Sequence, residues 1–216
     1  MAFFIKWREI YLIIAALDLE GVLVPEIWIN FAEFTGINEL RATTRDVPDY
    51  NLLMQQRLRL LRENKLGLAD IQNVIAQMRP LPGALDFLTW LRQRFQVVIL
   101  SDTFYEFAMP LIKQLGWPIL LCHRLAVDEH GMVSDYILRQ ADGKRQCIKA
   151  FHSLNFKVIA AGDSYNDTTM LAEADAGILF RPPQNVIDEF PQFPVTRDYN
   201  ELEYAFTRAR NEMNGM

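Results

Sequence analysis

Cysteine is scarce in this chain of 216 residues, which contains only Cys122 and Cys147. Their spacing matches neither a CxxC redox motif nor a set of zinc ligands, so we expect two reduced thiols in a cytoplasmic protein. The chain also has no excess of basic residues. It contains 22 lysines and arginines against 27 acidic residues, which gives a formal net charge of −5. This balance favours a soluble protein and argues against a nucleic-acid partner.

The start of the chain also lacks a hydrophobic run long enough to cross a membrane. Residues 10–17 are apolar and follow two basic residues, as the core of a signal peptide would. The run is too short to span a bilayer, it ends at Asp18 and Glu20, and no small-residue cleavage site follows it. We therefore expect a buried strand here and no membrane partner, while residues 1–9 have no clear role.

Hydrophobic residues are abundant, since they make up half of the chain and fall in short runs separated by amphipathic helical patterns. This alternation predicts βαβ units, and the continuous apolar runs suit parallel strands that helices cover on both faces. The clearest strands are residues 10–17, 97–100 and 158–161, with weaker candidates at 119–122 and 177–180. The expected fold class is α/β, with a Rossmann-like parallel sheet.

The pattern changes after the first strand, where three amphipathic helices replace the strand-like runs. The helical stretches are residues 26–35, 50–64 and 68–78. We interpret residues 25–80 as a small helical cap that sets substrate specificity, and residues 1–24 together with 81–216 as the α/β core. In the core we also expect a helix near 83–93, a β-hairpin flap within 124–139 and an irregular proline-rich stretch at 181–194.

Polar residues follow three of the predicted strands, namely Asp18, Ser101 and Asp163. In open α/β sheets, ligands bind beyond the carboxyl ends of the strands. We therefore expect these three residues at one edge of the sheet, which makes that edge the candidate functional site.

Four carboxylates in two of these segments suggest a metal site. Asp18 and Glu20 are separated by one residue, and an anionic carboxylate can approach a phosphoryl group only with a bridging cation, for which oxygen ligands suit Mg²⁺. Asp163 and Asp167 are four residues apart, and Gly162 permits close approach. A solvated acidic pair at a strand end is the alternative interpretation of the first two.

Two further segments offer groups that bind phosphate. Ser101, Asp102 and Thr103 precede a predicted helix, whose N-terminus would supply hydroxyl and N–H donors, although an ordinary N-cap also explains them. Lys144 could stabilise the negative charge of a phosphoryl-transfer transition state. Arg145 competes for that role, and a solvated turn is the alternative.

Together and in this order, the four segments resemble the haloacid dehalogenase superfamily of phosphotransferases, from residue 10 onward. The resemblance implies that Asp18 attacks phosphorus and becomes an aspartyl-phosphate. Glu20 stands where the family usually has a second aspartate, the general acid and base, whose backbone carbonyl also binds Mg²⁺. The remaining implied roles are metal binding by Asp163 with support from Asp167, and phosphate binding by Ser101 and Lys144.

Two residues of the predicted cap region suit an amino-acid phosphate. Arg57 could bind a carboxylate in a bidentate manner, and Glu26 could bind an ammonium group. For Arg57, a solvated helix face is the alternative. Residues 18–26, 100–106 and 161–170, together with the cap, resemble phosphoserine phosphatases.

Those three segments resemble most closely the bacterial bifunctional enzymes that also transfer phosphate from phosphoserine to homoserine. This resemblance implies that phosphoserine and homoserine are the small-molecule substrates, and it places Asn166 near them. Asp102 and Thr103 are expected to line the substrate site, where phosphoserine phosphatases have glycines, so less room is left for the substrate.

Several alternatives stay open at the level of sequence. The chain could act on another small phosphomonoester, act as a mutase, or be a non-catalytic binding relative, and it could form a homodimer. His123, His130 and His152 show no ligand spacing, and we assign none of them to catalysis.

Overall fold

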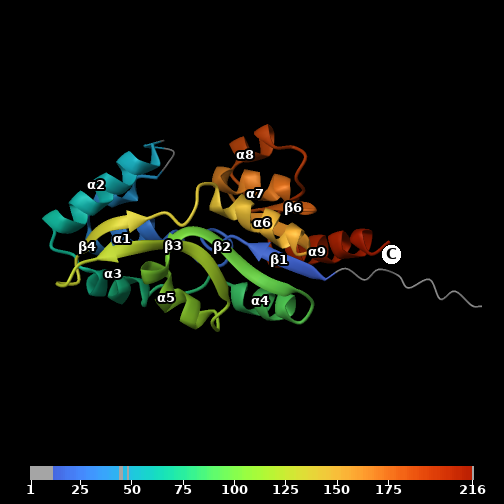
Figure 1. Ribbon diagram of the computed structural model, residues 1–216, viewed down its shortest axis with the longest axis horizontal. Coiled ribbons are helices and arrows are strands. Elements are labelled where there is room, and N and C mark those ends of the chain that lie inside the picture. The colour runs from blue at the N-terminus through green and yellow to red at the C-terminus, as the bar shows by residue number, and fades with distance from the viewer. Residues whose placement is uncertain (1–11, 44–45, 48, 216) are drawn as a thin grey trace, which may run out of the picture.

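One mixed sheet lies at the centre of the computed structural model, which describes residues 12–43, 46–47 and 49–215 (Figure 1). Its strand order is β4-β3-β2-β1-β5-β6-β7, and all neighbouring pairs are parallel except β3 and β4. The strands are β1 (Ile13–Leu17), β2 (Gln96–Phe104), β3 (Ile119–Val127), β4 (Val133–Ile137), β5 (Lys157–Gly162), β6 (Ala176–Phe180) and β7 (Val195–Thr196). The predicted α/β class is confirmed, while residues 1–11 lie outside the described part of the chain.

The central strand β1 is buried on both faces. Its side chains Ile13, Ala15 and Leu17 belong to one apolar cluster. The intervening Ile14 and Ala16 belong to a second cluster, because successive side chains of a strand point to opposite faces. This explains why the first predicted strand is a continuous apolar run rather than an alternating one.

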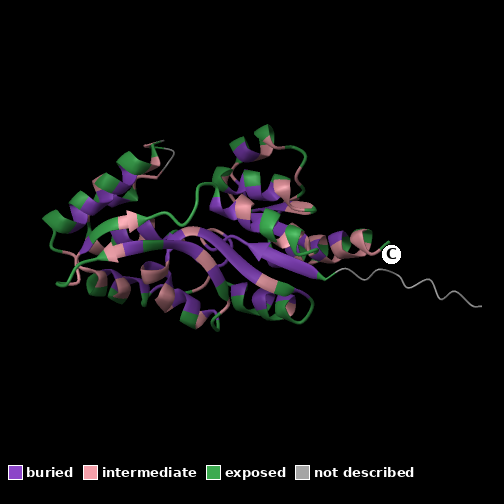
Figure 2. Cartoon of the chain, in the orientation of Figure 1, coloured by how far each residue is buried: buried purple, intermediate pink, exposed green. Residues whose placement is uncertain are grey.

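Helices cover both faces of the sheet, and burial is concentrated in the strands between them (Figures 1 and 2). The first face carries α4 (Ala84–Arg92), α5 (Tyr105–Gln114) and α9 (Tyr199–Met213), and the second carries α6 (Gly143–Ser153), α7 (Thr168–Glu173) and α8 (Gln184–Glu189). A short 3₁₀ helix, η2 (Tyr165–Asp167), precedes α7. No helix in the described part of the chain has the length and apolar character needed to cross a membrane.

The segment between β1 and α4 is helical, as the sequence predicts. It contains α1 (Ile27–Thr35), the 3₁₀ helix η1 (Asn38–Arg41), α2 (Tyr50–Glu63) and α3 (Leu68–Ile75). Its entry and exit are adjacent, because the Leu81 N–H donates a hydrogen bond to the Leu23 carbonyl at 2.9 Å. The function of this segment as a cap remains a prediction.

Pro110 lies inside α5 and helps to fasten this insertion to the core. Proline has no N–H, so the carbonyl four residues earlier, that of Glu106, has no helical partner. The side chain of Gln72, on α3, donates a hydrogen bond to that carbonyl at 2.7 Å. The missing N–H of Pro110 therefore leaves the Glu106 carbonyl available to accept this hydrogen bond from α3.

The hairpin of β3 and β4 lies where the sequence predicts a flap. Asp128 shapes its turn, because Asp128 Oδ1 accepts hydrogen bonds from the N–H groups of His130 and Met132 at 2.9 and 2.8 Å. The two cysteines, Cys122 and Cys147, are free and buried.

Two segments differ from the prediction. Strand β2 does not end at Leu100 but continues to Phe104, which pairs with His123 of β3 after a shift in register. Helix α8 forms within the stretch 181–194 that we expected to be irregular. Its start follows two prolines, which fit there because the first N–H groups of a helix need no partner within the helix.

Candidate active site

The carboxyl end of β1 brings Asp18 to a buried position at the edge of the sheet. Its N–H donates to the Ala161 carbonyl at 2.9 Å, which continues the pairing with β5, and its side chain is buried. Asp18 Oδ1 accepts a hydrogen bond from the Leu19 N–H at 2.7 Å. Burial and the nearby charge of Asp167 raise the pKa of Asp18 well above its ordinary value. Its ionisation therefore depends on nearby positive charge.

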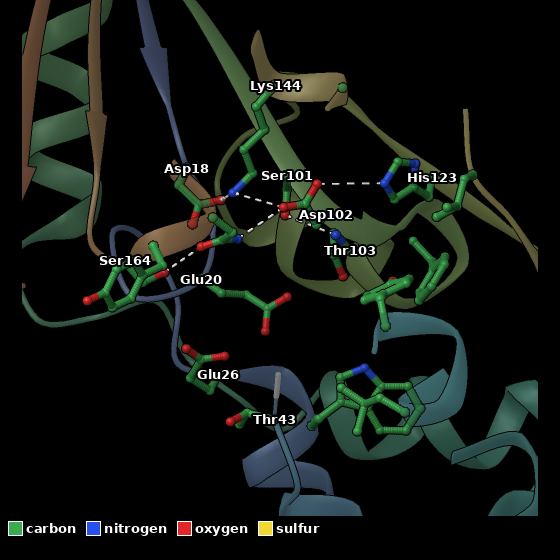
Figure 3. A pocket seen from close by; sticks show the side chains of 18 of the residues that line it. Asp18, Glu20, Glu26, Thr43, Ser101, Asp102, Thr103, His123, Lys144 and Ser164 are labelled. Atoms are coloured by element: carbon green, nitrogen blue, oxygen red, sulfur yellow. Dashed lines mark hydrogen bonds and ion pairs between the residues drawn. The ribbon is translucent and has the colours of Figure 1, made fainter. Parts of the chain in front are cut away.

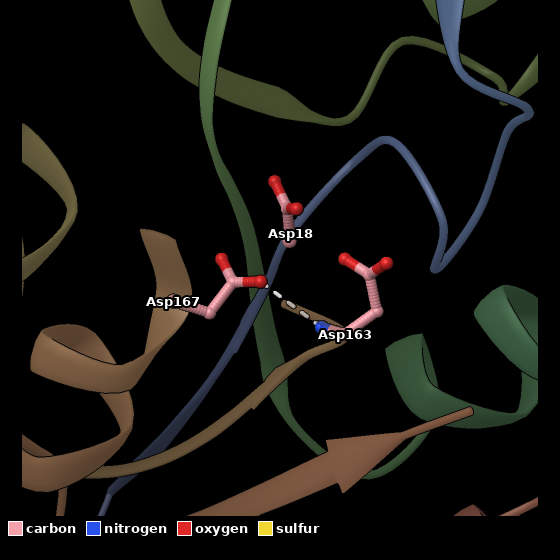
Figure 4. Close-up of side chains that lie close together, drawn as sticks. All are labelled: Asp18, Asp163 and Asp167. Carbon is pink, nitrogen blue, oxygen red and sulfur yellow. Dashed lines mark hydrogen bonds between the residues drawn. The ribbon is translucent and has the colours of Figure 1, made fainter. Parts of the chain in front are cut away.

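Asp163 and Asp167 lie beside Asp18, and ligand oxygens of the three are within 4.8 Å of one another (Figure 4). Two glycines make this approach possible. A Cβ on Gly162 would lie 2.4 Å from the Asp167 side chain, and one on Gly21, whose φ is +76°, would lie 2.4 Å from Asp163 Oδ2. Burial and the charge of Asp167 raise the pKa of Asp163 to about 7. Three hard oxygen ligands in one buried cluster suit a cation such as Mg²⁺.

Lys144 places one ammonium among these carboxylates from the first turn of α6. Its Nζ lies 2.7 Å from Asp167 Oδ1, 2.9 Å from Asp18 Oδ1 and 3.4 Å from Asp102 Oδ2. Burial alone would lower the pKa of Lys144, but Asp167 and Asp18 outweigh it and raise that pKa well above its ordinary value. The competing Arg145 instead pairs with Glu173 of α7 at 2.7 Å. Lys144 is therefore the basic residue of this motif that lies in the cluster.

Ser101 and Thr103 reach the site from β2 and not from a helix N-terminus. Both side chains are buried, and the Thr103 N–H donates to Ser101 Oγ at 3.2 Å. Helix α5 begins only at Tyr105, with Phe104 at its N-cap. The expected cradle at a helix N-terminus is therefore wrong, because β2 runs through this motif to Phe104, where pairing with β3 resumes after a shift in register.

The candidate residues surround one cavity of about 580 Å³ (Figure 3). The lining residues that the sequence singled out are Asp18, Glu20, Glu26, Arg57, Ser101, Asp102, Thr103, Lys144, Asp163 and Asn166. Asp167 is not part of the lining, because it is fully buried behind Lys144. The cavity thus combines groups from the sheet edge with groups from the helical insertion.

Glu20 extends into this cavity from the loop after β1 (Figure 3). Its Oε2 accepts a hydrogen bond from the Ile27 N–H, at the start of α1, at 2.8 Å. Burial and the charge of Glu26 raise the pKa of Glu20 to about 8. A carboxyl group with this pKa can both give and take a proton near neutral pH.

Arg57 lies on the buried face of α2 and not on a solvated one. Its guanidinium lies 4.4 Å from the centre of the Trp28 ring, and Nη2 donates to the Ala42 carbonyl at 2.9 Å. Its Nε is buried without a hydrogen-bond partner among the described residues. Burial lowers the pKa of Arg57 to about 10. Arg57 lines the cavity, and so does Glu26, which is exposed.

Asp102 and Asn166 join two of the motifs on the cavity wall. Asn166 Nδ2 donates to Asp102 Oδ2 at 3.0 Å. Burial would raise the pKa of Asp102, but the charge of Lys144 and hydrogen bonds from His123 and Asn166 lower it below its ordinary value. Asp102 is therefore an ionised carboxylate facing the ammonium.

The family follows from comparison with known proteins. A model of the haloacid dehalogenase-like hydrolases, described as Hydrolase, matches residues 13–175. The chain belongs to this family.

Two relatives from Pseudomonas share about two thirds of their residues with this haloacid dehalogenase-like chain. A protein of Pseudomonas syringae pv. tomato named phosphoserine phosphatase is 67% identical over 198 residues, covering 92% of this chain and 84% of the relative. A protein of Pseudomonas aeruginosa named phosphoserine phosphatase ThrH is 65% identical over 196 residues, covering 91% of this chain and 96% of the relative.

Solved structures agree on the haloacid dehalogenase-like fold. A crystal structure of the phosphoserine phosphatase from T. onnurineus superposes with a TM-score of 0.70 at 23% identity, covering 93% of this chain and 96% of that one. A phospho-aspartyl intermediate analogue of a phosphoserine phosphatase gives a TM-score of 0.71 at 18% identity, covering 90% and 99%. At these identities the similarity concerns the fold.

His123 and Tyr50 line the cavity of this family member but received no functional role from the sequence. His123, near the middle of β3, is buried and faces Asp102. It directly follows a predicted strand, as Asp18 and Ser101 do, but it was given no role because the histidines show no ligand spacing. Tyr50, at the start of α2, carries no such signal, because only the position of the helix turns it toward the cavity.

Proposed function

We propose that this chain is a cytoplasmic, Mg²⁺-dependent phosphoserine phosphatase that also transfers the phosphoryl group of phosphoserine to homoserine. The observation that carries the proposal is the buried Asp18 carboxylate, 2.9 Å from Lys144 Nζ, in a cavity that Arg57 also lines. The names of the two Pseudomonas relatives support phosphoserine as the substrate. The resemblance of residues 18–26, 100–106 and 161–170 to bifunctional enzymes supports homoserine as a second acceptor.

In the first half-reaction, an oxygen of Asp18 attacks phosphorus, and the bond between phosphorus and the seryl oxygen breaks. Lys144 and Ser101 bind phosphoryl oxygens and stabilise the charge that spreads over them. Glu20 is largely protonated at neutral pH, because its pKa is raised to about 8. It gives its proton to the seryl oxygen, so serine leaves as a neutral alcohol.

In the second half-reaction, the ionised Glu20 takes a proton from water or from the hydroxyl of homoserine. The resulting oxygen nucleophile attacks phosphorus, and the bond between phosphorus and Asp18 breaks. Inorganic phosphate or phosphohomoserine leaves, and both the Asp18 carboxylate and the protonated Glu20 are restored.

Asp18, Asp163 and Asp167, together with the backbone carbonyl of Glu20, would hold the Mg²⁺ ion. The fit of the three aspartates rests on the donor set, because oxygens of two buried carboxylates and one half-buried carboxylate converge within 4.8 Å, with the Lys144 ammonium beside Asp18 and Asp167. When bound, the ion supplies the positive charge that lets an anionic carboxylate meet an anionic phosphate.

The amino-acid part of the substrate would lie beside the cavity residues that come from the helical insertion. Arg57 would bind the carboxylate, and Glu26 would bind the ammonium group, because both line the cavity. Asp102, Thr103 and Asn166 would line the cavity between these two residues and the groups that bind phosphate. Serine and homoserine differ by one methylene, which a pocket discriminates by only about 1–3 kcal/mol, so one such clamp could hold either.

The direct test follows labelled phosphoserine in the presence of Mg²⁺ and rising concentrations of homoserine. We expect inorganic phosphate without homoserine and an increasing share of phosphohomoserine as homoserine rises. Phosphate release with no phosphohomoserine at any concentration would leave a plain phosphatase. Turnover of p-nitrophenyl phosphate without turnover of phosphoserine would refute the proposed substrate.

The matched variants are Asp18→Asn and Asp86→Asn. Both remove one carboxylate, but Asp86 is exposed on α4, away from the cavity. We expect Asp18→Asn to fold and to lose Mg²⁺-dependent turnover, while Asp86→Asn keeps it. Unchanged activity of Asp18→Asn would remove Asp18 from the role of nucleophile.

A further inference from the structure

His123 is a buried polar residue of the cavity wall to which the mechanism above gives no task. Its Nε2 lies 3.7 Å from Asp102 Oδ1 (Figure 3). Its Nδ1 accepts a hydrogen bond from the Arg139 N–H at 3.1 Å. Since Nδ1 is an acceptor, the proton of the neutral ring is on Nε2, on the side of Asp102.

Asp102 connects this imidazole to the groups that would bind phosphate. Its Oδ1 faces His123, whereas its Oδ2 lies 3.4 Å from Lys144 Nζ and accepts the hydrogen bond from Asn166. The two oxygens of one carboxylate are thus held from opposite sides. Asp102 cannot turn both oxygens toward Lys144 without leaving His123.

The distance between Asp102 and Lys144 matters because an ammonium has only three N–H donors. Three carboxylates surround Lys144 Nζ, and those of Asp167 and Asp18 are close, at 2.7 and 2.9 Å. Asp102 is the most distant, and its side chain is 37% exposed toward the cavity. The Lys144 N–H group that points toward Asp102 is therefore the one that can donate to a phosphoryl oxygen. It stays available only if Asp102 does not approach Lys144 more closely.

We propose that His123 is a positioning residue, which holds Asp102 away from Lys144 and so keeps an ammonium donor available for the phosphoryl group. Arg139, which fixes the ring, lies between the β3–β4 hairpin and α6, the helix that carries Lys144. The effect of His123 on turnover rests on the proposed function, but its effect on phosphate binding does not.

The test compares variants of the full chain with Mg²⁺ present. Inorganic phosphate is titrated by calorimetry, and KM and kcat are measured for phosphoserine. His123→Gln keeps a side-chain N–H group near the position of Nε2, whereas His123→Leu has none. We expect the leucine variant to weaken phosphate binding and raise KM by roughly ten- to a hundredfold, with a smaller change in kcat.

Two controls separate positioning from folding. Because it keeps an N–H group facing Asp102, His123→Gln should stay within roughly a few-fold of wild type, and His130→Gln, in the exposed hairpin turn, should leave all constants unchanged. Should the leucine variant fail to fold, His123→Asn takes its place, because its amide oxygen can accept from Arg139 but its side chain does not reach Asp102.

The Asp102→Asn background gives the decisive comparison. A neutral amide competes poorly for the ammonium, so His123→Leu should have little further effect there. Equal losses in both backgrounds, equal losses for glutamine and leucine, or unchanged phosphate affinity would each overturn the positioning role. Wild-type protein that binds phosphate but does not hydrolyse phosphoserine would refute the proposed function and leave this role testable by calorimetry.

Discussion

Replacing Gly162 by alanine should impair the acidic cluster without removing any of its carboxylates. A Cβ at this position would lie 2.4 Å from both Cβ and Cγ of Asp167, whereas ordinary contacts begin near 3.4 Å. Asp167 would therefore have to move by about 1 Å, the difference between these distances. It is fully buried, and its Oδ2 accepts hydrogen bonds from the N–H groups of Asp163 and Ser164 at 3.0 and 3.1 Å.

The magnitude follows from these bonds. A hydrogen bond to a charged group contributes roughly 1.5–3 kcal/mol, so weakening both should lower the free energy of unfolding by about 2–4 kcal/mol. Displacing a metal-site carboxylate should weaken Mg²⁺ binding about 10- to 100-fold. Calorimetric titration with Mg²⁺ and thermal unfolding measure the two effects separately.

Gly36→Ala is the matched control for this substitution. Gly36 ends α1 with a φ of +73°, and a Cβ there meets nothing within 4 Å. Alanine should therefore cost about 1 kcal/mol of stability through backbone strain alone, with Mg²⁺ affinity unchanged. If Gly162→Ala bound Mg²⁺ as tightly as wild type, the placement of Asp167 would not matter for the metal, and the reasoning would be refuted.

Three further predictions concern individual side chains. Arg57→Ala should raise KM for phosphoserine roughly 10- to 100-fold but leave KM for p-nitrophenyl phosphate unchanged. Arg59 is exposed on the same helix, so Arg59→Ala should change neither KM. An equal rise in KM for both substrates would exclude Arg57 from substrate recognition. Glu20→Gln should lower kcat about 10²- to 10⁴-fold with little change in KM, measured by steady-state kinetics, and a normal kcat would exclude Glu20 as the acid. Asp163 has a pKa raised to about 7, so its contribution to stability is present at low pH and lost as pH rises through 7. Chemical unfolding of the metal-free protein should therefore show less stability at pH 8 than at pH 5, on the order of a few kcal/mol, and Asp163→Asn should show a smaller loss; an equal loss would contradict the assignment.

Buried parallel strands were predictable because their sequence signal is local. Strand β1 is apolar on both faces, so a continuous run marks it without knowledge of its neighbours. The end of β2 was not predictable, because Ser101 to Thr103 are polar and the strand resumes its pairing with β3 only at Phe104, after a shift in register. Helix α8 was missed for a similar reason, since its prolines indicate an irregular segment unless they immediately precede a helix.

Side-chain roles within a motif depend on where an element packs, and the sequence does not contain that information locally. Arg57 and Arg59 are two residues apart on α2, yet Arg57 is buried while the Arg59 side chain is 63% exposed. Lys144 and Arg145 are adjacent on α6, and only Lys144 faces the carboxylates. In both pairs the charge pattern identifies the helix, and tertiary packing selects the residue.

The surroundings of Lys144 indicate when Asp18, the proposed nucleophile, can be ionised. One ammonium lies among the carboxylates of Asp18, Asp102 and Asp167, with Asp163 close by. Burial and the negative charge of Asp167 raise the pKa values of Asp18 and Asp163, and the Lys144 ammonium does not offset these two effects. A carboxyl group attacks phosphorus only when it is ionised, so Asp18 gains reactivity as further positive charge enters the cluster. Binding of the cation and ionisation of Asp18 should therefore favour each other. The same cation would reduce the repulsion between these carboxylates and an anionic phosphate.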